Sequence, residues 1–180
     1  MRRLAIGIGS SIGIMCALLG HCHGQGLEGV RTLPMGGQLG ADTVIQVQGK
    51  VEPWPPGIWS SHANISAKPS ETAGQMTLSV SSDSPKGKSF IRFFNDQSAS
   101  PLLPILLSEP PVAAEIEPTD VFRKPQLVQV HGDAWIVDGV RQKSGDVDHY
   151  GLAMKQGERW WIAVDAHRSL RSPMDACLQI

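Results

Sequence analysis

Five carboxylates are the residues of this chain whose spacing could support chemistry. Glu115, Glu117 and Asp120 fall within "EIEPTD", and Asp146 and Asp148 are separated by a single residue in "GDVDHY". Side chains two apart in an extended segment point to the same side, so each pair can face a common point. Such a group could hold a metal ion, act as an acid–base pair, or consist of turn residues. At this stage all three readings are open.

The catalytic readings find little support in the rest of the chain. A glycosidase-type pair of carboxylates needs a cleft between its members, and nothing in the sequence indicates one. Beyond the first 25 residues there is no G-x-S-x-G sequence, and His62, His131, His149 and His167 are scattered through strand-like segments without a nucleophile pattern. We expect Cys177 to be a small buried hydrophobic residue. The sequence therefore predicts no catalytic residues, and the chain is predicted not to be an enzyme.

Residues 1–25 have the layout of a secretory signal peptide. Arg2 and Arg3 precede an uncharged apolar stretch over 4–19, which is short for a membrane span and has no basic stop-transfer cluster behind it. We therefore expect export to the periplasm, cell surface or medium, with no transmembrane segment after signal removal. The alternative is a lipoprotein anchored through Cys22, because "LGHC" faintly resembles a bacterial lipobox.

Charge and composition exclude one class of partner and favour one fold class. Lys plus Arg number 16 and Asp plus Glu 17, so no electrostatic attraction to nucleic acid is predicted. The 19 glycines and 13 prolines favour many short strands over long helices.

The elements that must position the carboxylates are predicted to be strands. Apolar and polar residues alternate with period two over 43–49, 74–82 and 88–96, as in strands with one face on a core. The prolines of 53–57 predict a loop, and 58–67 is predicted to be a crossing or edge strand.

A second strand-rich part is predicted after a proline-rich connection. Residues 106–120 interrupt the alternation, as inter-domain connections do. Strands are then expected at 126–130, 135–140, 148–156, 159–166 and 175–180. The strands within 148–166 are predicted to form a hairpin that packs inward through Tyr150, Leu152, Met154, Trp160, Ile162 and Val164.

The tryptophans divide into core and surface candidates. Trp135 and Trp160 fall on predicted inward faces. Trp54, Trp59 and Trp161 could lie on the surface, where aromatic platforms bind sugars or protein chains. For Trp54, packing over one end of a sandwich is the alternative. An extracellular polymer or protein is therefore the expected partner.

Two stretches resemble known secreted domains. "EIEPTD", "VDGVRQKSGDVDHYGLAMKQGERWWIAVDA" and "SPMDACLQI" resemble the bacterial pre-peptidase C-terminal domain, a small β-sandwich, with a departure at Thr119 where that family usually has asparagine. Upstream, "LPMGGQLGADTVIQVQGK" and the "SPKG" turn look like the immunoglobulin-like region that precedes such domains in planctomycete-type secreted proteins. The resemblance implies an all-β chain: an immunoglobulin-like sandwich over 27–112, then an incomplete jelly-roll or β-sandwich over 115–180.

The same resemblance implies a ligand for the carboxylates. In related collagen-binding domains the matching acidic positions bind calcium, a cation that takes six to eight oxygen ligands from flexible carboxylates and carbonyls. The implied Ca²⁺ ligands here are Glu115, Glu117, Asp120, Asp146 and Asp148. Turn-forming aspartates at Asp146 and Asp148 are the alternative.

Together these features predict a non-catalytic, secreted accessory or binding module that is a fragment of a larger exported protein. The family pattern continues beyond a strand like "MDACLQI" with further strands, so the second sandwich is expected to be incomplete. The alternative function is the amino-terminal piece of a secreted, peptidase-type hydrolase whose catalytic domain is encoded downstream.

Overall fold

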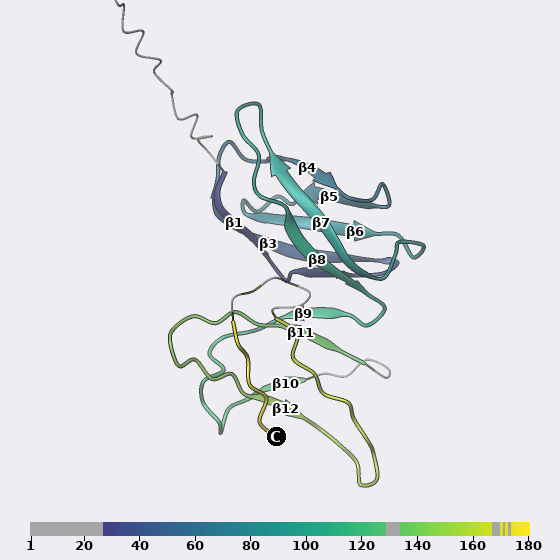
Figure 1. The fold of residues 1–180 in the computed structure, drawn as a ribbon, viewed down its shortest axis with the longest axis vertical. Helices are drawn as coiled ribbons and strands as arrows, with labels where there is room; N and C mark the ends of the chain where they lie inside the picture. The colour runs from purple at the N-terminus through teal and green to yellow at the C-terminus, as the bar shows by residue number, and fades with distance from the viewer. Residues whose placement is uncertain (1–26, 129–133, 167–169, 171, 173) are drawn as a thin grey trace, which may run out of the picture.

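A computed structural model describes residues 27–128, 134–166, 170, 172 and 174–180 (Figure 1). The predicted signal peptide, Cys22, His131 and His167 lie outside the described residues. Every element in the described part is a β-strand, which confirms the all-β prediction. None of the described residues belongs to a helix with the length and apolarity needed to cross a membrane.

Residues 27–108, here called the first region, form two four-stranded sheets. One sheet has the order β1-β3-β6-β5 and is antiparallel throughout, with strands β1 (Leu27–Leu33), β3 (Ala41–Val51), β6 (Gln75–Val80) and β5 (Ile65–Pro69). The other has the order β2-β8-β7-β4, with β2 (Gly36–Gln38), β8 (Leu103–Ser108), β7 (Gly87–Phe94) and β4 (Gly57–Ser60). Only the β2–β8 pair of this second sheet is parallel.

The core of the first region lies between these sheets. Met76, Leu78 and Val80 of β6 are buried and alternate with half-buried polar residues, as the period-two pattern predicts. Each fully buried side chain of this kind contributes about 1.5–3 kcal/mol. The complete cluster of buried apolar residues is Leu27, Val30, Ile45, Val47, Ile65, Met76, Leu78, Val80, Ile91, Phe93, Ile105 and Leu107.

Two glycines shape the edge of the first sheet. The register between β1 and β3 shifts between Glu28 and Arg31, where Gly29 has a φ of 60° and Gly49 a φ of 97°. A Cβ atom at Gly49 would lie 2.5 Å from the Gly29 carbonyl oxygen, so only glycine fits there. The resulting bulge bends the strand pair.

Residues 112–180, here called the second region, contain two small parallel sheets. β9 (Val112–Ala114) pairs with β11 (Ile136–Asp138), and β10 (Gln126–Val128) pairs with β12 (Tyr150–Leu152). No described apolar residue of this region is buried; its buried residues are Thr119 and Asp138. Polar contacts therefore have a larger part in organising it than an apolar core.

The two regions touch directly. Three residues, 109–111, join β8 to β9, and Lys86 forms an ion pair with Glu109 at 2.6 Å. β9 lies next to the first region in Figure 1, and a Cβ atom at Gly36 would lie 3.5 Å from the Val112 methyl groups. The backbone amide of Met35 donates a hydrogen bond to the Asp138 carboxylate.

Two of the predicted segments before residue 121 need correction. Residues 58–67 form two strands, β4 and β5, which belong to different sheets. Ser60 lies at the turn between them, where its Oγ is 2.7 Å from the His62 carbonyl oxygen and 2.9 Å from the Ile65 carbonyl oxygen and can donate its one proton to either. The segment 106–120, read as a connection, contains the end of β8 and all of β9.

The predicted hairpin over 148–166 is wrong. Its turn is present, since Glu158 donates its amide to the Lys155 carbonyl oxygen at 3.1 Å, but β12 pairs in parallel with β10 and residues 159–166 form no strand. Four of the six side chains expected to pack inward are exposed: Tyr150, Met154, Ile162 and Val164. No strand is present over 174–180 either, and Cys177 is exposed where a buried residue was expected.

Candidate metal site around Thr119

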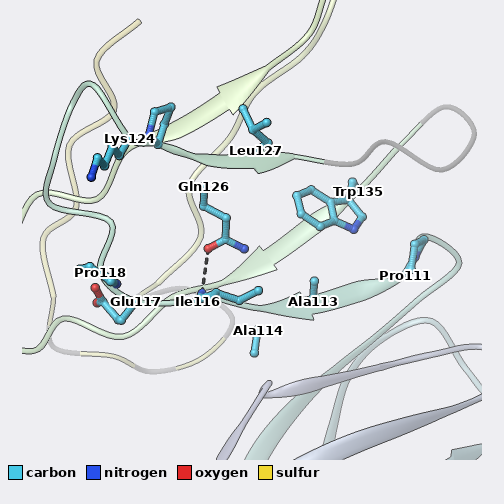
Figure 2. Close-up of a pocket in the computed structure, with 11 residues that line it drawn as sticks. Pro111, Ala113, Ala114, Ile116, Glu117, Pro118, Lys124, Gln126, Leu127 and Trp135 are labelled. Carbon is cyan, nitrogen blue, oxygen red and sulfur yellow. Dashed lines mark hydrogen bonds between the residues drawn. The ribbon is translucent and has the colours of Figure 1, made fainter.

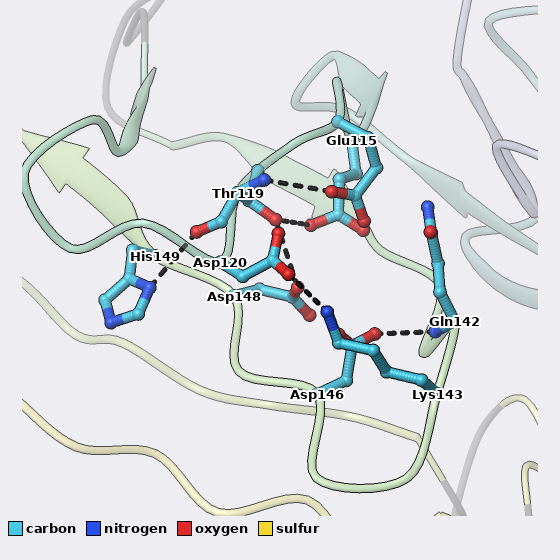
Figure 3. A network of polar contacts seen from close by, with 9 residues as sticks. Glu115, Thr119, Asp120, Gln142, Lys143, Asp146, Asp148 and His149 are labelled. Atoms are coloured by element: carbon cyan, nitrogen blue, oxygen red, sulfur yellow. Dashed lines mark hydrogen bonds and ion pairs between the residues drawn. The ribbon is translucent and has the colours of Figure 1, made fainter.

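Three segments of the second region bring the acidic residues together. Glu115 follows β9, and its amide donates to the Asp138 carbonyl oxygen of β11 at 2.9 Å. Thr119 lies a few residues further along, and Asp148 precedes β12. Figure 3 shows these side chains converging on Thr119 from both sides.

Thr119 is the centre of this network and is fully buried. Its amide donates to Glu117 Oε2 at 2.9 Å, and its carbonyl oxygen accepts the His149 amide at 3.1 Å. His149 Nδ1 also lies 3.1 Å from that carbonyl, so this ring nitrogen carries the proton. One threonine thus joins the segment 115–119 to the start of β12.

Glu115 holds three segments at once. Its Oε1 accepts the Tyr150 hydroxyl at 2.8 Å and lies 2.9 Å from Thr119 Oγ1, while its Oε2 accepts the Val140 amide at 3.0 Å. Although the side chain as a whole is exposed, desolvation of its hydroxyl, followed by the hydrogen bond to Glu115, raises the pKa of Tyr150 well above its usual range. Tyr150 therefore stays a neutral donor to this carboxylate.

The Thr119 hydroxyl lies within hydrogen-bond distance of two carboxylates but can donate to only one of them. Its Oγ1 lies 2.9 Å from Glu115 Oε1 and 3.0 Å from Asp148 Oδ1, but a hydroxyl has a single proton to donate. Desolvation raises the pKa of Asp148, opposed by the Thr119 hydrogen bond and reinforced by the charge of Glu115. A proton on Asp148, donated to Thr119 Oγ1, satisfies all three groups; a cation beside the carboxylates is the other way to offset their repulsion.

Three of the five predicted ligands can meet one ion. Glu115, Glu117 and Asp148 each offer a carboxylate oxygen, and these oxygens lie within 4.8 Å of one another. Oxygens bound to one Ca²⁺ at about 2.3–2.6 Å lie no more than about 5 Å apart, so the spacing fits this ion. Glu117 is exposed, which leaves one side open for water as a further ligand.

The other two predicted ligands are turned toward a lysine. Lys143 Nζ forms an ion pair with Asp120 and lies 3.9 Å from Asp146 Oδ1, while Asp146 Oδ2 accepts the Gln142 amide at 2.6 Å. The Lys143 ammonium lowers the pKa of Asp120, and Asp120 in turn raises the pKa of Lys143. Asp146 closes the turn at residues 142–146, in line with its alternative reading as a turn residue.

Asp138 is a buried carboxylate that the sequence did not single out. It ends β11 and accepts the Met35 amide from the first region. Desolvation raises its pKa, which the Met35 hydrogen bond opposes and the charge of Glu115 reinforces. Because its backbone carbonyl binds the Glu115 amide, Asp138 links the carboxylate group to the junction between the regions.

Two cavities lie in or beside the second region. The larger, about 640 Å³, lies between the two small sheets, where the Gln126 side chain accepts the Ile116 amide at 2.8 Å (Figure 2). Its wall is formed by Pro111, Ala113, Ala114, Ile116, Glu117, Pro118, Lys124, Pro125, Gln126, Leu127 and Trp135. The smaller, about 390 Å³, includes Glu115 and Glu117 in its wall and faces Arg31 of the first region. Neither wall contains a described nucleophile–base pair.

Comparison with known proteins gives no match: no family model, no curated protein and no solved structure is similar to this chain. The resemblance to secreted sandwich domains therefore stays a prediction.

Proposed function

We infer that this chain is a non-catalytic, exported binding module whose second region binds calcium through Glu115, Glu117 and Asp148. In this proposal the first region is an immunoglobulin-like sandwich and the second an incomplete sandwich of the pre-peptidase C-terminal type. The observation that carries the calcium proposal is the position of Thr119 Oγ1, which has one proton to donate, at 2.9 and 3.0 Å from two carboxylate oxygens. A divalent cation would relieve this repulsion without requiring a proton on Asp148.

The lack of a buried apolar cluster supports the same proposal. Carboxylates from the segments 115–119 and 146–148 meet where the described part of the second region has no apolar core. A cation that binds these carboxylates only when they are assembled stabilises the folded state by mass action. Asp120 and Asp146 could join as ligands only by leaving Lys143.

Thermal unfolding of the exported chain with calcium and with chelator tests this proposal. Because Ca²⁺ binds only the assembled site, the melting temperature of the second region should rise with calcium, by the equivalent of about 2.7 kcal/mol at one hundred times Kd. Glu117→Gln combined with Asp148→Asn should abolish the rise.

The matched control is Asp120→Asn, which removes a carboxylate bound to Lys143 and should leave the calcium-dependent rise in place. Identical melting curves in millimolar calcium and in chelator would contradict calcium binding. In that case Asp146 and Asp148 would remain as turn and network residues.

A further inference from the structure

Exposed apolar side chains of the first region gather at one place. The large apolar residues with substantial exposure are Val44, Trp59 at 48%, Phe94 at 43% and Leu102 at 46%. All except Val44 lie around Arg92 on the outer face of the β2-β8-β7-β4 sheet. We call Trp59, Arg92, Phe94 and Leu102 the Arg92 patch.

Strand register places three of these side chains together, and Leu102 lies at the start of the neighbouring strand. Trp59 of β4 is directly opposite Arg92 of β7, so their side chains share one face. Phe94 is two residues beyond Arg92 on the same strand and also on that face. On the other side of β7, Leu102 directly precedes β8, next to Leu103, which is paired with Ile91.

Gly57 allows the Phe94 ring to pack directly against the sheet. Gly57 is paired with Phe94, and a Cβ atom at Gly57 would lie 2.6 Å from Phe94 Cζ. The Phe94 ring therefore fills the space that a side chain at position 57 would need. It packs over the backbone of β4, beside Trp59.

Arg92 has no acidic partner within the described part of the chain. No ion pair involves its guanidinium there, and its Nε is buried without a hydrogen-bond acceptor. Because this Nε is buried, a ligand on the outer face would meet the guanidinium through its Nη1 and Nη2 groups. The guanidinium fork matches a carboxylate in two parallel hydrogen bonds.

The opposite sheet has a different outer face. Around Val44 on β3, the neighbours on the same face are Asp42 and Gln46, and the residues across from these three on β6 are Thr77, Ser79 and Gln75. This polar surface is what one expects of a solvated sheet. Apolar rings around an unpaired arginine are specific to the β4–β7 side.

We propose that the Arg92 patch binds a pyranose ring bearing a carboxylate, as found in acidic polysaccharides. Trp59 and Phe94 offer aromatic surface to the C–H face of the sugar, and Arg92 binds its carboxylate. With about half of each apolar side chain exposed, the patch presents roughly 300 Å², well below the ≈ 800 Å² per partner of a stable protein interface. That area suits one or two sugar rings.

This inference rests on the proposed role as a binding module, but it does not involve the calcium-binding residues. The patch lies on β4 and β7 of the first region, whereas the carboxylates belong to residues 115–148. Sugar binding measured in chelator is therefore separable from calcium binding. A negative result for sugar binding would not contradict calcium binding, and the reverse also holds.

Calorimetric titration of the exported chain with hexagalacturonate, in chelator and moderate salt, tests the proposal. Cellohexaose, a neutral hexamer, and poly-glutamate serve as competitors of other classes. We expect binding to hexagalacturonate with at least tenfold preference over both. Trp59→Ala should weaken it about tenfold, because the stacking surface is lost.

Arg92→Lys keeps the charge but loses the fork, so affinity for hexagalacturonate should also fall at least tenfold. Val44→Ala, an exposed apolar residue on the opposite sheet, is the matched control and should bind like the unaltered chain. Unfolding curves establish that each variant is folded. Since Trp59 is half exposed, its variant provides a test even if Arg92→Lys unfolds the sheet.

Three outcomes would overturn the proposal. Equal affinity for cellohexaose would mean stacking without carboxylate recognition. Stronger binding to poly-glutamate that depends on Arg92 would point to an acidic protein partner. If hexagalacturonate does not bind, or if both Trp59→Ala and Arg92→Lys retain binding, the Arg92 patch does not bind this sugar.

Discussion

The two regions of this molecule are built on different principles. The first region buries twelve apolar side chains between two four-stranded sheets, while the described part of the second buries only Thr119 and Asp138. Most of the large exposed apolar residues belong to the second region, including Trp161 at 92% exposure. The first region has a closed apolar core, whereas the second depends on hydrogen bonds among carboxylates, a threonine and a tyrosine.

Because their stabilising contacts differ, the two regions should respond differently to mutation, pH and ions. Apolar burial is insensitive to pH and ions, so the first region should depend on packing. A network of carboxylates changes with protonation and with bound cations, so the second should respond to solution conditions.

The largest effect should come from the core of the first region. Phe93→Ala removes a fully buried ring between the sheets and should lower the free energy of unfolding by about 3–5 kcal/mol. Trp161→Ala, at a 92% exposed position of the second region, should change it by less than about 0.5 kcal/mol. Urea denaturation measures both. A larger loss for Trp161→Ala would mean that the second region has an apolar core after all.

The Thr119 network should show the next largest effect. Thr119→Val keeps the shape but removes the hydroxyl between Glu115 and Asp148, which should cost about 1–3 kcal/mol. Hydrogen exchange should speed up at the amides of Gln126 and His149 and stay unchanged at β3 and β6. Thr119→Ser, which keeps the hydroxyl, is the control. Faster exchange in both regions would show that they unfold as one unit.

A smaller effect should follow pH. Burial raises the folded-state pKa of Asp148, so its contribution to stability is fully present below about pH 4, the ordinary aspartate range, and is lost as pH rises through the raised value. Carbon NMR titration should place the Asp148 pKa above that of an exposed aspartate. Asp148→Asn mimics the protonated form and should flatten this part of the pH dependence. An Asp148 pKa at or below the ordinary value would contradict the proton-sharing arrangement.

The smallest effect should come from Lys143. Its ion pair with Asp120 is exposed, and such pairs contribute little to stability. Lys143→Ala should leave the unfolding curve unchanged, while the pKa of Asp120 rises toward its ordinary value because the ammonium is gone. Lys143→Arg should keep the pKa low. A clear loss of stability in Lys143→Ala would give this ion pair a structural role in the second region.

The sequence predicted the parts of the fold that have a local signal. Strict alternation identified β3, β6 and β7, because one buried face gives a period of two. β8 was missed because "LLPILL" is apolar on both faces, and its outer residues Pro104 and Leu106 are half buried. The hairpin prediction failed because alternation over 159–166 gives a strand-like pattern but does not specify a pairing partner.

The candidate site was predictable only in its residue types. The clustered carboxylates in "EIEPTD" and "GDVDHY" predict Glu115, Glu117 and Asp148 as metal-ligand candidates from the sequence alone, and these three side chains do come together. The central position of Thr119 was not predicted, because its contact with Asp148 spans 29 residues. Likewise, the hydrogen bond from the Met35 amide to the Asp138 carboxylate spans 103 residues, and no local sequence pattern predicts it.

The connection between β8 and β9 gives the molecule a mechanical property. Residues 109–111 include two prolines, and Glu109 is held by Lys86 at 2.6 Å and by the Gln38 side chain at 3.0 Å. A pull on the second region therefore reaches β8 with almost no slack. Since β8 is hydrogen-bonded to both β2 and β7, a load along its axis shears two rows of hydrogen bonds together instead of unzipping one. A pulling force would therefore unfold the second region, whose described part has no buried apolar side chain, before it unfolds the sandwich.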